Sequence, residues 1–287
     1  MRFVLMALGV LFLANIARAE VAENKDWRPV DSQNLLLIKT AYGDVAVELN
    51  PEFAPKHSQR LRDLAKAHFY DGLSFYRVID GFVAQGGREE GALPDWPELK
   101  NENDRAAEGL AFVPTGSPDL YAPEAGHVGG FAAAQNSKTG RAWLMHCVGA
   151  MAMARDTDPD TGDAEFYIVI GPGTRYLDRN LTIFGRVIDG MEFIQKLNRG
   201  KRPINSGVIG DKAKRDPIIS ITLAADLPEA ERPAFEVMRT QGQAFADYKT
   251  SKQVRDAEFF YRRPPEVIEA CNVQAPVRRV GEPEAMP

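Results

Sequence analysis

Alternating hydrophobic and polar positions recur in short runs along most of the chain. Residues 35–40 are largely apolar, and Val45, Val47 and Leu49 alternate with small or polar neighbours after the turn-forming residues 42–44. Side chains two positions apart on a strand face the same side of a sheet, so this pattern predicts a β-hairpin. Further short strands are predicted at residues 75–79, 149–154, 165–170, 183–187 and 219–223.

Two segments favour helices instead. Pro55 suits a first helical turn, and Leu61 and Leu64 then supply an apolar stripe. A second, short helix is expected from Gly190 through Asn198. Many short strands, two capping helices and Gly-rich turns predict a mainly β protein with a closed antiparallel barrel.

Two stretches interrupt this pattern. Residues 20–33 are polar and are predicted to be an irregular N-terminal segment. Residues 88–142 are rich in Gly, Pro, Asn, Asp and Glu, which predicts a loop-rich insertion with two short strands, one of them near residues 130–134. The barrel domain would then extend over residues 34–226.

The character of the sequence changes again after Leu227. Residues 228 to about 256 have a helix-forming composition, so residues 227–287 are predicted to be a C-terminal helical extension. Phe235, Met238, Phe245 and Tyr248 are its candidate core contacts. Residues 259–261 are expected to dock onto the barrel, and residues 274–287 are expected to form a mobile tail.

The first residues predict export. Arg2 precedes an apolar run over residues 3–16, and Ala17-Arg18-Ala19 fits a cleavage site, so residues 1–19 read as a signal peptide. The run is shorter than the ~20 residues that span a bilayer, so no stable membrane insertion is expected after cleavage. We expect a periplasmic or secreted monomer.

Charge and histidine spacing exclude other classes. Without Arg2 and Arg18, 33 basic residues face 40 acidic ones, a net charge of −7. Since no basic block stands out, nucleic acid is not an expected partner. The four His residues have no metal-ligand spacing, so no metal site is predicted.

Cys147 and Cys271 are the two cysteines. In an oxidising compartment they would form a disulfide that ties the extension to the main domain and contributes ~2–4 kcal/mol, although two free thiols fit the sequence equally well. A Cys147–His146 nucleophile is disfavoured, because neighbours on a strand point to opposite faces.

One run carries unusual chemistry. Residues 74–87 read SFYRVIDGFVAQGG. Strand alternation would place Arg77 on the same face as Phe75 and Ile79. A charge among large apolar groups is unfavourable unless it has a partner or a task. This composition suits a site that binds a hydrophobic residue and polarises a neighbouring amide.

The same run resembles the signature of the cyclophilins, the peptidyl-prolyl cis/trans isomerases, which reads roughly Phe-His-Arg-Ile-Ile-x-Gly-Phe-x-x-Gln-Gly-Gly. Farther along, MAR at 153–155 and EFYI at 165–168 resemble the family's Met-Ala-Asn and Gln-Phe-Phe-Ile. YLD at 176–178 and IFGRV at 183–187 resemble Trp-Leu-Asp and Val-Phe-Gly-x-Val. The resemblance spans roughly residues 34–225 and implies a cyclophilin-like barrel.

The resemblance also implies site residues and a mechanism without a cofactor. Arg77, Phe82 and Gln85 would be catalytic. Substrate contacts are implied at Val83, Ala154, Arg155, Glu165, Tyr167, Tyr176 and Leu177. Rotation about a prolyl amide has a barrier near ~20 kcal/mol, and in the twisted state the prolyl nitrogen regains a lone pair. An arginine that donates to this nitrogen would stabilise the transition state more than the planar ground state.

Departures from the family pattern affect specificity. Glu165 stands in place of Gln and Arg155 in place of Asn; these residues could pair, or alter the preferred flanking residue. Tyr176 replaces a Trp that helps to bind cyclosporin, which predicts weak inhibition. Leu181 falls where many members have a His at the pocket rim.

The sequence therefore predicts a cofactor-independent prolyl isomerase acting on X-Pro bonds of unfolded or partly folded exported proteins. The alternative is a cyclophilin-fold peptide-binding module or chaperone with little turnover. The presence of Arg77, Phe82 and Gln85 together favours the enzyme.

Overall fold

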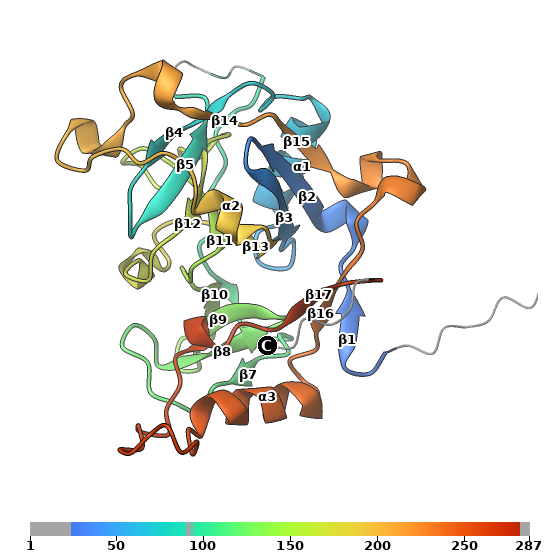
Figure 1. The fold of residues 1–287 in the computed structure, drawn as a ribbon, viewed down its shortest axis with the longest axis vertical. Helices are drawn as coiled ribbons and strands as arrows, with labels where there is room; N and C mark the ends of the chain where they lie inside the picture. Colours follow the sequence, from blue (N-terminus) through green and yellow to red (C-terminus); the bar gives the residue numbers. More distant parts are fainter. Residues whose placement is uncertain (1–23, 90–92, 94, 282–287) are drawn as a thin grey trace, which may run out of the picture.

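The computed structural model describes residues 24–89, 93 and 95–281 (Figure 1). The predicted signal peptide at residues 1–19 lies outside these described residues. The described strands form a barrel sheet, a smaller insertion sheet and a third sheet beside them. Within the described part of the chain, no helix is both long and apolar enough to cross a membrane.

The barrel is a single antiparallel sheet. Among the described residues, nine strands follow the order β14-β4-β5-β12-β11-β13-β3-β2-β15. They are β2 (Leu35–Thr40), β3 (Gly43–Leu49), β4 (Ser74–Val78), β5 (Val83–Gly87), β11 (Ala150–Met153), β12 (Phe166–Val169), β13 (Ile183–Asp189), β14 (Asp216–Pro217) and β15 (Ser220–Leu223). This mainly β, antiparallel fold confirms the fold class predicted from the short alternating strands.

One segment joins the two edges of the barrel sheet. Strands β14 and β15 are separated only by Ile218 and Ile219. The Ile218 N–H donates to the Leu73 carbonyl (2.7 Å) beside β4, and the Ile219 N–H donates to the Lys39 carbonyl (2.9 Å) of β2. The sheet therefore curls until a single stretch of chain pairs with both of its ends.

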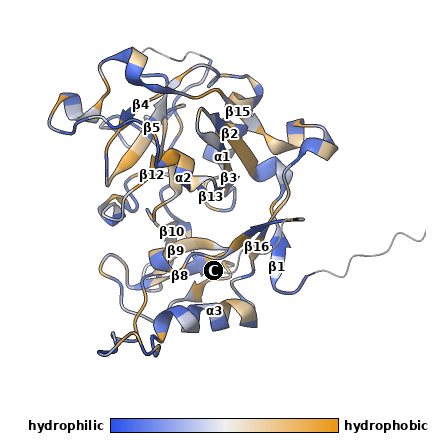
Figure 2. Cartoon of the chain, viewed as in Figure 1, coloured by the Kyte–Doolittle hydropathy of each residue, from blue (hydrophilic) through white to orange (hydrophobic). Residues whose placement is uncertain are grey.

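Two helices belong to the barrel, α1 (Pro55–Lys66) and α2 (Met191–Ile194). The predicted stripe of α1, Leu61 and Leu64, is fully buried in the barrel core. Figure 2 shows hydrophobic residues concentrated on elements such as β2 and α2. Helix α2 ends earlier than predicted: the Lys196 and Leu197 N–H groups donate to carbonyls only three residues back, and the Asn198 N–H donates to the Asp216 carboxylate (2.5 Å).

The insertion is more ordered than the sequence indicated. In the described chain it forms a sheet in the order β6-β10-β9-β8-β7. The strands are β6 (Arg105–Ala106), β7 (Val113–Pro114), β8 (Glu124–Val128), β9 (Phe131–Asn136) and β10 (Arg141–Leu144). The predicted strand near residues 130–134 is present in β9, and most of the described residues within 88–142 lie in loops as predicted. The expected number of two strands was wrong, because strands rich in Ala and Gly have weak β-propensity. Gly129 and Gly130, both at positive φ, turn the chain between β8 and β9.

The two chain ends also contain strands. A third sheet pairs β1 (Trp27–Pro29), β16 (Phe235–Met238) and β17 (Val277–Arg279). Strand β1 lies in the segment predicted to be irregular (20–33), β16 in the predicted helix (228 to about 256) and β17 in the predicted mobile tail (274–287). These three predictions were wrong at those strands. Helix α3 covers only Gln243–Gln253. Phe235 and Val237 are buried while Glu236 and Met238 are not, which is a strand pattern hidden within a helix-like composition.

The extension packs on the insertion sheet. Figure 1 shows α3 beside β7, and the Lys249 ammonium donates to the Pro114 carbonyl (3.0 Å). Cys147 and Cys271 form a disulfide with an S–S distance of 2.02 Å, so of the two readings left open by the sequence the bridge is the one observed. Phe259 and Tyr261 are exposed, so the expected docking of residues 259–261 onto the barrel was wrong.

Short 3₁₀ helices complete the described structure. They are η1 (Ser32–Asn34), η2 (Arg175–Leu177), η3 (Asn205–Gly207), η4 (Lys212–Lys214), η5 (Ala224–Asp226), η6 (Glu229–Glu231) and η7 (Ala270–Asn272).

Candidate active site

Arg77 is held at the barrel surface by two hydrogen bonds. It lies on β4 opposite Gln85 of β5, and its Nη1 donates to Gln85 Oε1 (2.9 Å). Its Nε donates to the Ser206 carbonyl (2.9 Å), which lies in η3, far away in the sequence. Partial burial lowers the pKa of Arg77, and the nearby charge of Arg202 acts in the same direction. The guanidinium therefore has a fixed orientation.

The expected shared face of Phe75, Arg77 and Ile79 was wrong. Phe75 lies in the barrel core, whereas Tyr76 and Arg77 both contact Gln85. The reason is an irregular register between Ser74 and Arg77, which places neighbouring residues on the same side.

A small pocket lies beside the Arg77 guanidinium. It has a volume of about 180 Å³. Its lining consists of Arg77, Phe82, Val83, Gln85, Ala154, Arg155, Tyr167, Leu177 and Leu181. The structure thus brings together all of the predicted site residues except Glu165 and Tyr176. We refer to this cavity as the Arg77 pocket.

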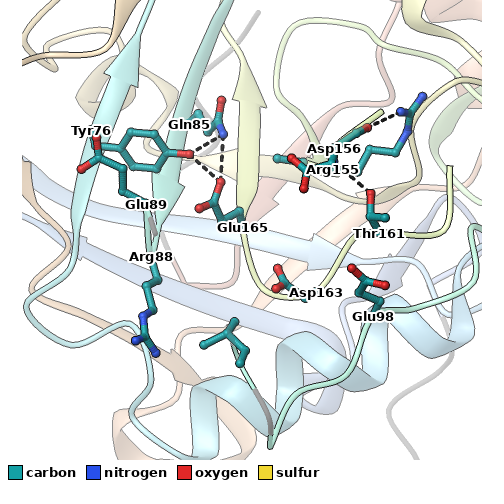
Figure 3. Close-up of a pocket in the computed structure, with 12 residues that line it drawn as sticks. Tyr76, Gln85, Arg88, Glu89, Glu98, Arg155, Asp156, Thr161, Asp163 and Glu165 are labelled. Carbon is teal, nitrogen blue, oxygen red and sulfur yellow. Dashed lines mark hydrogen bonds between the residues drawn. The ribbon is translucent and has the colours of Figure 1, made fainter. Parts of the chain in front are cut away.

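Glu165 belongs to a second, larger depression next to the Arg77 pocket (Figure 3). Its volume is about 570 Å³, and Gln85, Ala154 and Arg155 line both cavities. Most of its charged lining is acidic: Glu89, Glu98, Asp156, Asp163 and Glu165. Burial raises the pKa of Glu165, with the charges of Asp163 and Asp156 adding to the effect.

Glu165 and Arg155 do not pair with each other. The Arg155 guanidinium donates to the backbone carbonyls of Asn180 (2.9 Å) and Asp156 (2.6 Å). The Glu165 carboxylate accepts from the Tyr76 hydroxyl and from Gln85 Nε2 (3.1 Å), as Figure 3 shows. Of the alternatives weighed from the sequence, an ion pair between these residues was wrong.

The contact with Glu165 fixes the direction of the Gln85 amide. An ionised carboxylate only accepts hydrogen bonds, so Gln85 must present its NH₂ group to Glu165. The amide oxygen is then directed to Arg77, which only donates. The hydrogen bonds to Glu165 and to Arg77 therefore require the same orientation of the Gln85 amide.

Sequence reasoning missed the support behind the pocket. The buried Tyr167 hydroxyl lies 2.8 Å from His146 Nε2, and His146 Nδ1 lies 3.1 Å from Asp178 Oδ1. A tyrosine in place of the family's Phe was a usable signal, since a buried hydroxyl needs a partner. A nucleophilic role for Cys147 is wrong, because its sulfur is in the disulfide.

Tyr176 does not line the Arg77 pocket. It lies on η2 and faces a separate groove on the other side of that helix. Its neighbour Leu177 points into the pocket instead. Among the described residues, no group of three His, Cys, Asp or Glu side chains is placed to hold a metal ion.

Comparisons with known proteins agree with this geometry. The family model described as "Cyclophilin type peptidyl-prolyl cis-trans isomerase/CLD" matches residues 35–222. A probable peptidyl-prolyl cis-trans isomerase of Brucella suis is 31% identical over 199 residues, covering 68% of this chain and 85% of that protein. Peptidyl-prolyl cis-trans isomerase B of Bacillus subtilis is 33% identical over 158 residues, covering 54% of this chain and 84% of the other.

A solved structure is similar over a longer stretch. The crystal structure of cyclophilin AquaCyp293 from Hirschia baltica superposes with a TM-score of 0.71 at 28% sequence identity. The match covers 88% of this chain and 93% of that one, so the likeness extends beyond the residues matched by the family model.

Proposed function

The chain belongs to the cyclophilin-type peptidyl-prolyl cis/trans isomerases, and from this premise we propose that it isomerises X-Pro bonds of exported polypeptides in the Arg77 pocket. The observation that supports this site most directly is the anchored Arg77 guanidinium at the wall of a small, mostly apolar pocket. The substrates we propose are unfolded or partly folded chains that expose proline.

The apolar lining would hold the proline ring. Phe82, Val83, Tyr167 and Leu177 come from β5, β12, η2 and the turn before β5, so four parts of the chain build one cavity. The buried Tyr167 is kept in place by His146. A rigid pocket allows the ring to stay fixed while the preceding carbonyl rotates about the amide bond.

Arg77 would supply the electrostatic part of catalysis. Its guanidinium carries five N–H donors, and the bonds to Gln85 and Ser206 hold it from two sides. A further donor directed at the prolyl nitrogen gains strength only when that nitrogen becomes pyramidal in the twisted state. Lowering the barrier by ~7 kcal/mol would accelerate exchange by about 10⁵-fold.

Export is the second part of the proposal. The signal-like residues 1–19 and the Cys147–Cys271 disulfide support an oxidising compartment, since disulfides are rare in the cytosol. Fractionation of cells that make the full chain tests this, with N-terminal sequencing of the product. Export predicts a mature N terminus at Glu20 outside the cytosol, and an unprocessed cytosolic chain would contradict it.

The isomerase proposal is tested by cis/trans exchange of a short X-Pro peptide, measured by NMR. Arg77→Ala should lower kcat/KM by about 10²–10³-fold, as for other single donors to a transition state. Arg77→Lys should fall between this variant and the wild type, because it keeps the charge and loses the planar fork. No acceleration by a folded wild type, across several residues before proline, would instead support a peptide-binding module.

A further inference from the structure

The insertion sheet and η2 enclose a groove beyond the Arg77 pocket. Its volume is about 550 Å³. Its lining includes Tyr121, Pro123, Trp143, Tyr176, Arg179 and Asn180. We call it the tyrosine groove, because Tyr121 and Tyr176 are its two half-exposed aromatic residues, at 54% and 52% exposure.

The tyrosine groove and the Arg77 pocket share one wall. The wall is the stretch from η2 to the start of β13, residues 175–182. Tyr176 and Arg179 face the groove, whereas Leu177 and Leu181 face the pocket. A polypeptide bound in the pocket therefore has the groove directly beside it.

A buried ion network fixes both tyrosines. Arg175, only 3% exposed, donates to both carboxylate oxygens of Asp119 (3.0 Å each) and to Asp178 (2.6 Å). Asp119 also accepts the backbone N–H of Tyr121 (2.9 Å). The network thus joins the loop that carries Tyr121 to η2, which carries Tyr176.

Burying such a network carries a large desolvation cost. Taking three charged groups out of water costs several kcal/mol for each ion. Their mutual attraction offsets this cost only when the geometry of the ion pairs is good. The result here is a fixed backbone beneath two exposed rings, with the Arg175 guanidinium 5.3 Å from the Tyr121 ring centre. Aromatic side chains on a fixed backbone bind a ligand with little loss of conformational entropy.

We propose that the tyrosine groove binds the part of the substrate polypeptide that flanks the isomerised bond, and that it prefers an aromatic residue there. The inference rests on the proposed function of the Arg77 pocket. An aromatic side chain would stack on the tyrosine rings. Arg179 and Asn180 on the groove wall would offer N–H donors to the carbonyls of an extended chain.

The test compares peptides of one sequence and two lengths. A short peptide carries only the X-Pro bond and one residue on each side. Longer peptides add six residues before or after it, either all Ala and Ser or with one Phe moved along the flank. NMR measures both the exchange rate and the dissociation constant for the wild type, Tyr121→Ala and Tyr261→Ala, a control at a tyrosine of the extension that is 90% exposed.

The wild type should bind the best Phe-containing long peptide about 3- to 10-fold more tightly than the Ala and Ser peptide, as expected for one aromatic pair. Tyr121→Ala should lose this gain and keep the turnover of the short peptide, which also shows that it is folded. Tyr261→Ala should match the wild type, and Tyr121→Phe should retain the gain because the ring remains. Whichever flank shows the gain identifies the direction of the bound chain.

Two results would overturn the inference. One is equal binding of Phe-containing and Phe-free peptides by the wild type at every Phe position. The other is a gain that survives Tyr121→Ala. Failure of the isomerase proposal itself would appear separately, as no acceleration of the short peptide by the wild type.

Discussion

The barrel and the insertion sheet bury their hydrophobic faces in different ways. The barrel core is made of large side chains from its own strands and α1, such as Phe75, Phe166 and Phe184. The insertion sheet presents small residues on both sides: Ala133 packs in one cluster with barrel residues such as Tyr167, and Ala134 packs with Ala270 of the extension. The barrel core is therefore built from the barrel's own elements, whereas the insertion sheet packs on the barrel beside the Arg77 pocket and on the extension.

Besides the shared hydrophobic cluster, a buried ion cluster joins the insertion sheet to the barrel, and the disulfide and the packing of α3 hold the extension. In the ion cluster, Glu48 of β3 pairs with Arg186 of β13 (3.0 Å) and with Arg28 of β1 (2.6 Å). Arg186 also donates to the Gly130 carbonyl (2.5 Å), and Arg28 donates to that of Gly129. The cluster thus connects the barrel to the hairpin turn of the insertion sheet. Changes at each attachment test how far the two regions are independent.

The largest effect is expected at the ion cluster. Glu48→Ala leaves the buried Arg186 without its carboxylate, which should reduce the free energy of unfolding by about 3–5 kcal/mol. Chemical denaturation measures this loss. The matched control is Glu236→Ala, whose pair with Arg278 is more exposed (2.7 Å) and should contribute under about 1 kcal/mol. Equal losses from the two variants would show that the cluster does not hold the regions together.

The disulfide should have the next largest effect. It closes a loop of 124 residues, and Cys147→Ala with Cys271→Ala should lower the free energy of unfolding by about 2–4 kcal/mol. Limited proteolysis should then cut the extension first, while turnover of a short X-Pro peptide stays near that of the wild type. Wild-type protein in reductant should behave like the double variant. A loss of turnover in step with stability would show that the barrel is not independent.

The catalytic residues of the barrel were predicted from the sequence, whereas the distant groups that support them were not. Arg77, Phe82 and Gln85 lie within nine residues of chain, on two paired strands and the turn between them, so their spacing was enough to place them together. Ser206 and His146 are far from these residues in sequence, and only folding brings them to Arg77 and Tyr167.

The insertion and the extension were predicted less well for a physical reason. Their strands are short and contain Ala, Gly or helix-forming residues, so local propensity did not reveal them. What stabilises them is pairing with distant segments, such as β16 with both β1 and β17. Tertiary pairing of this kind leaves little local signal in a single sequence.

Acid should weaken the packing of α3 by a smaller amount. His127 of β8 packs edge-on against Phe245 of α3 at 5.0 Å between ring centres, and burial lowers the pKa of His127 from 6.5 to about 4. Between these values the unfolded chain binds the proton and the folded one does not, so stability falls as pH decreases through this window. The loss attributable to His127 should be roughly 2 kcal/mol at pH 5 relative to neutral pH.

Denaturation at pH 7.5 and pH 5 in wild type and His127→Gln measures this contribution. The glutamine side chain is neutral at both pH values. The free energy of unfolding of the variant should therefore fall by roughly 2 kcal/mol less than that of the wild type between pH 7.5 and pH 5. Other groups, such as the carboxylates of Asp104 and Asp119 whose pKa values are lowered by arginine partners, contribute equally to both proteins. An identical pH dependence in the two proteins would show that His127 does not titrate with folding.

The smallest effect should be confined to the barrel. Glu165→Gln keeps the shape of the side chain but replaces an ionised acceptor by a neutral amide, so the hydrogen bond that holds the Gln85 NH₂ group behind the Arg77 contact should weaken. The expected loss in kcat/KM at neutral pH is about two- to tenfold, the value of one hydrogen bond. The extension should remain as resistant to proteolysis as in the wild type.

A pH profile separates this orienting role from a purely structural one. Burial and the charges of Asp163 and Asp156 raise the pKa of Glu165, so its carboxylate gains a proton at a higher pH than an ordinary glutamate does. Wild-type kcat/KM should then fall toward that of Glu165→Gln, whose own profile should be flat in the same range. Asp156→Asn, which removes another carboxylate of the depression without touching Gln85, should keep an acid limb but move it to lower pH, because the Asp156 charge helps to raise the pKa of Glu165. If Glu165→Gln shows the same acid limb as the wild type, Arg77 is oriented by Ser206 and Gln85 alone, and the chemistry of the barrel does not depend on Glu165.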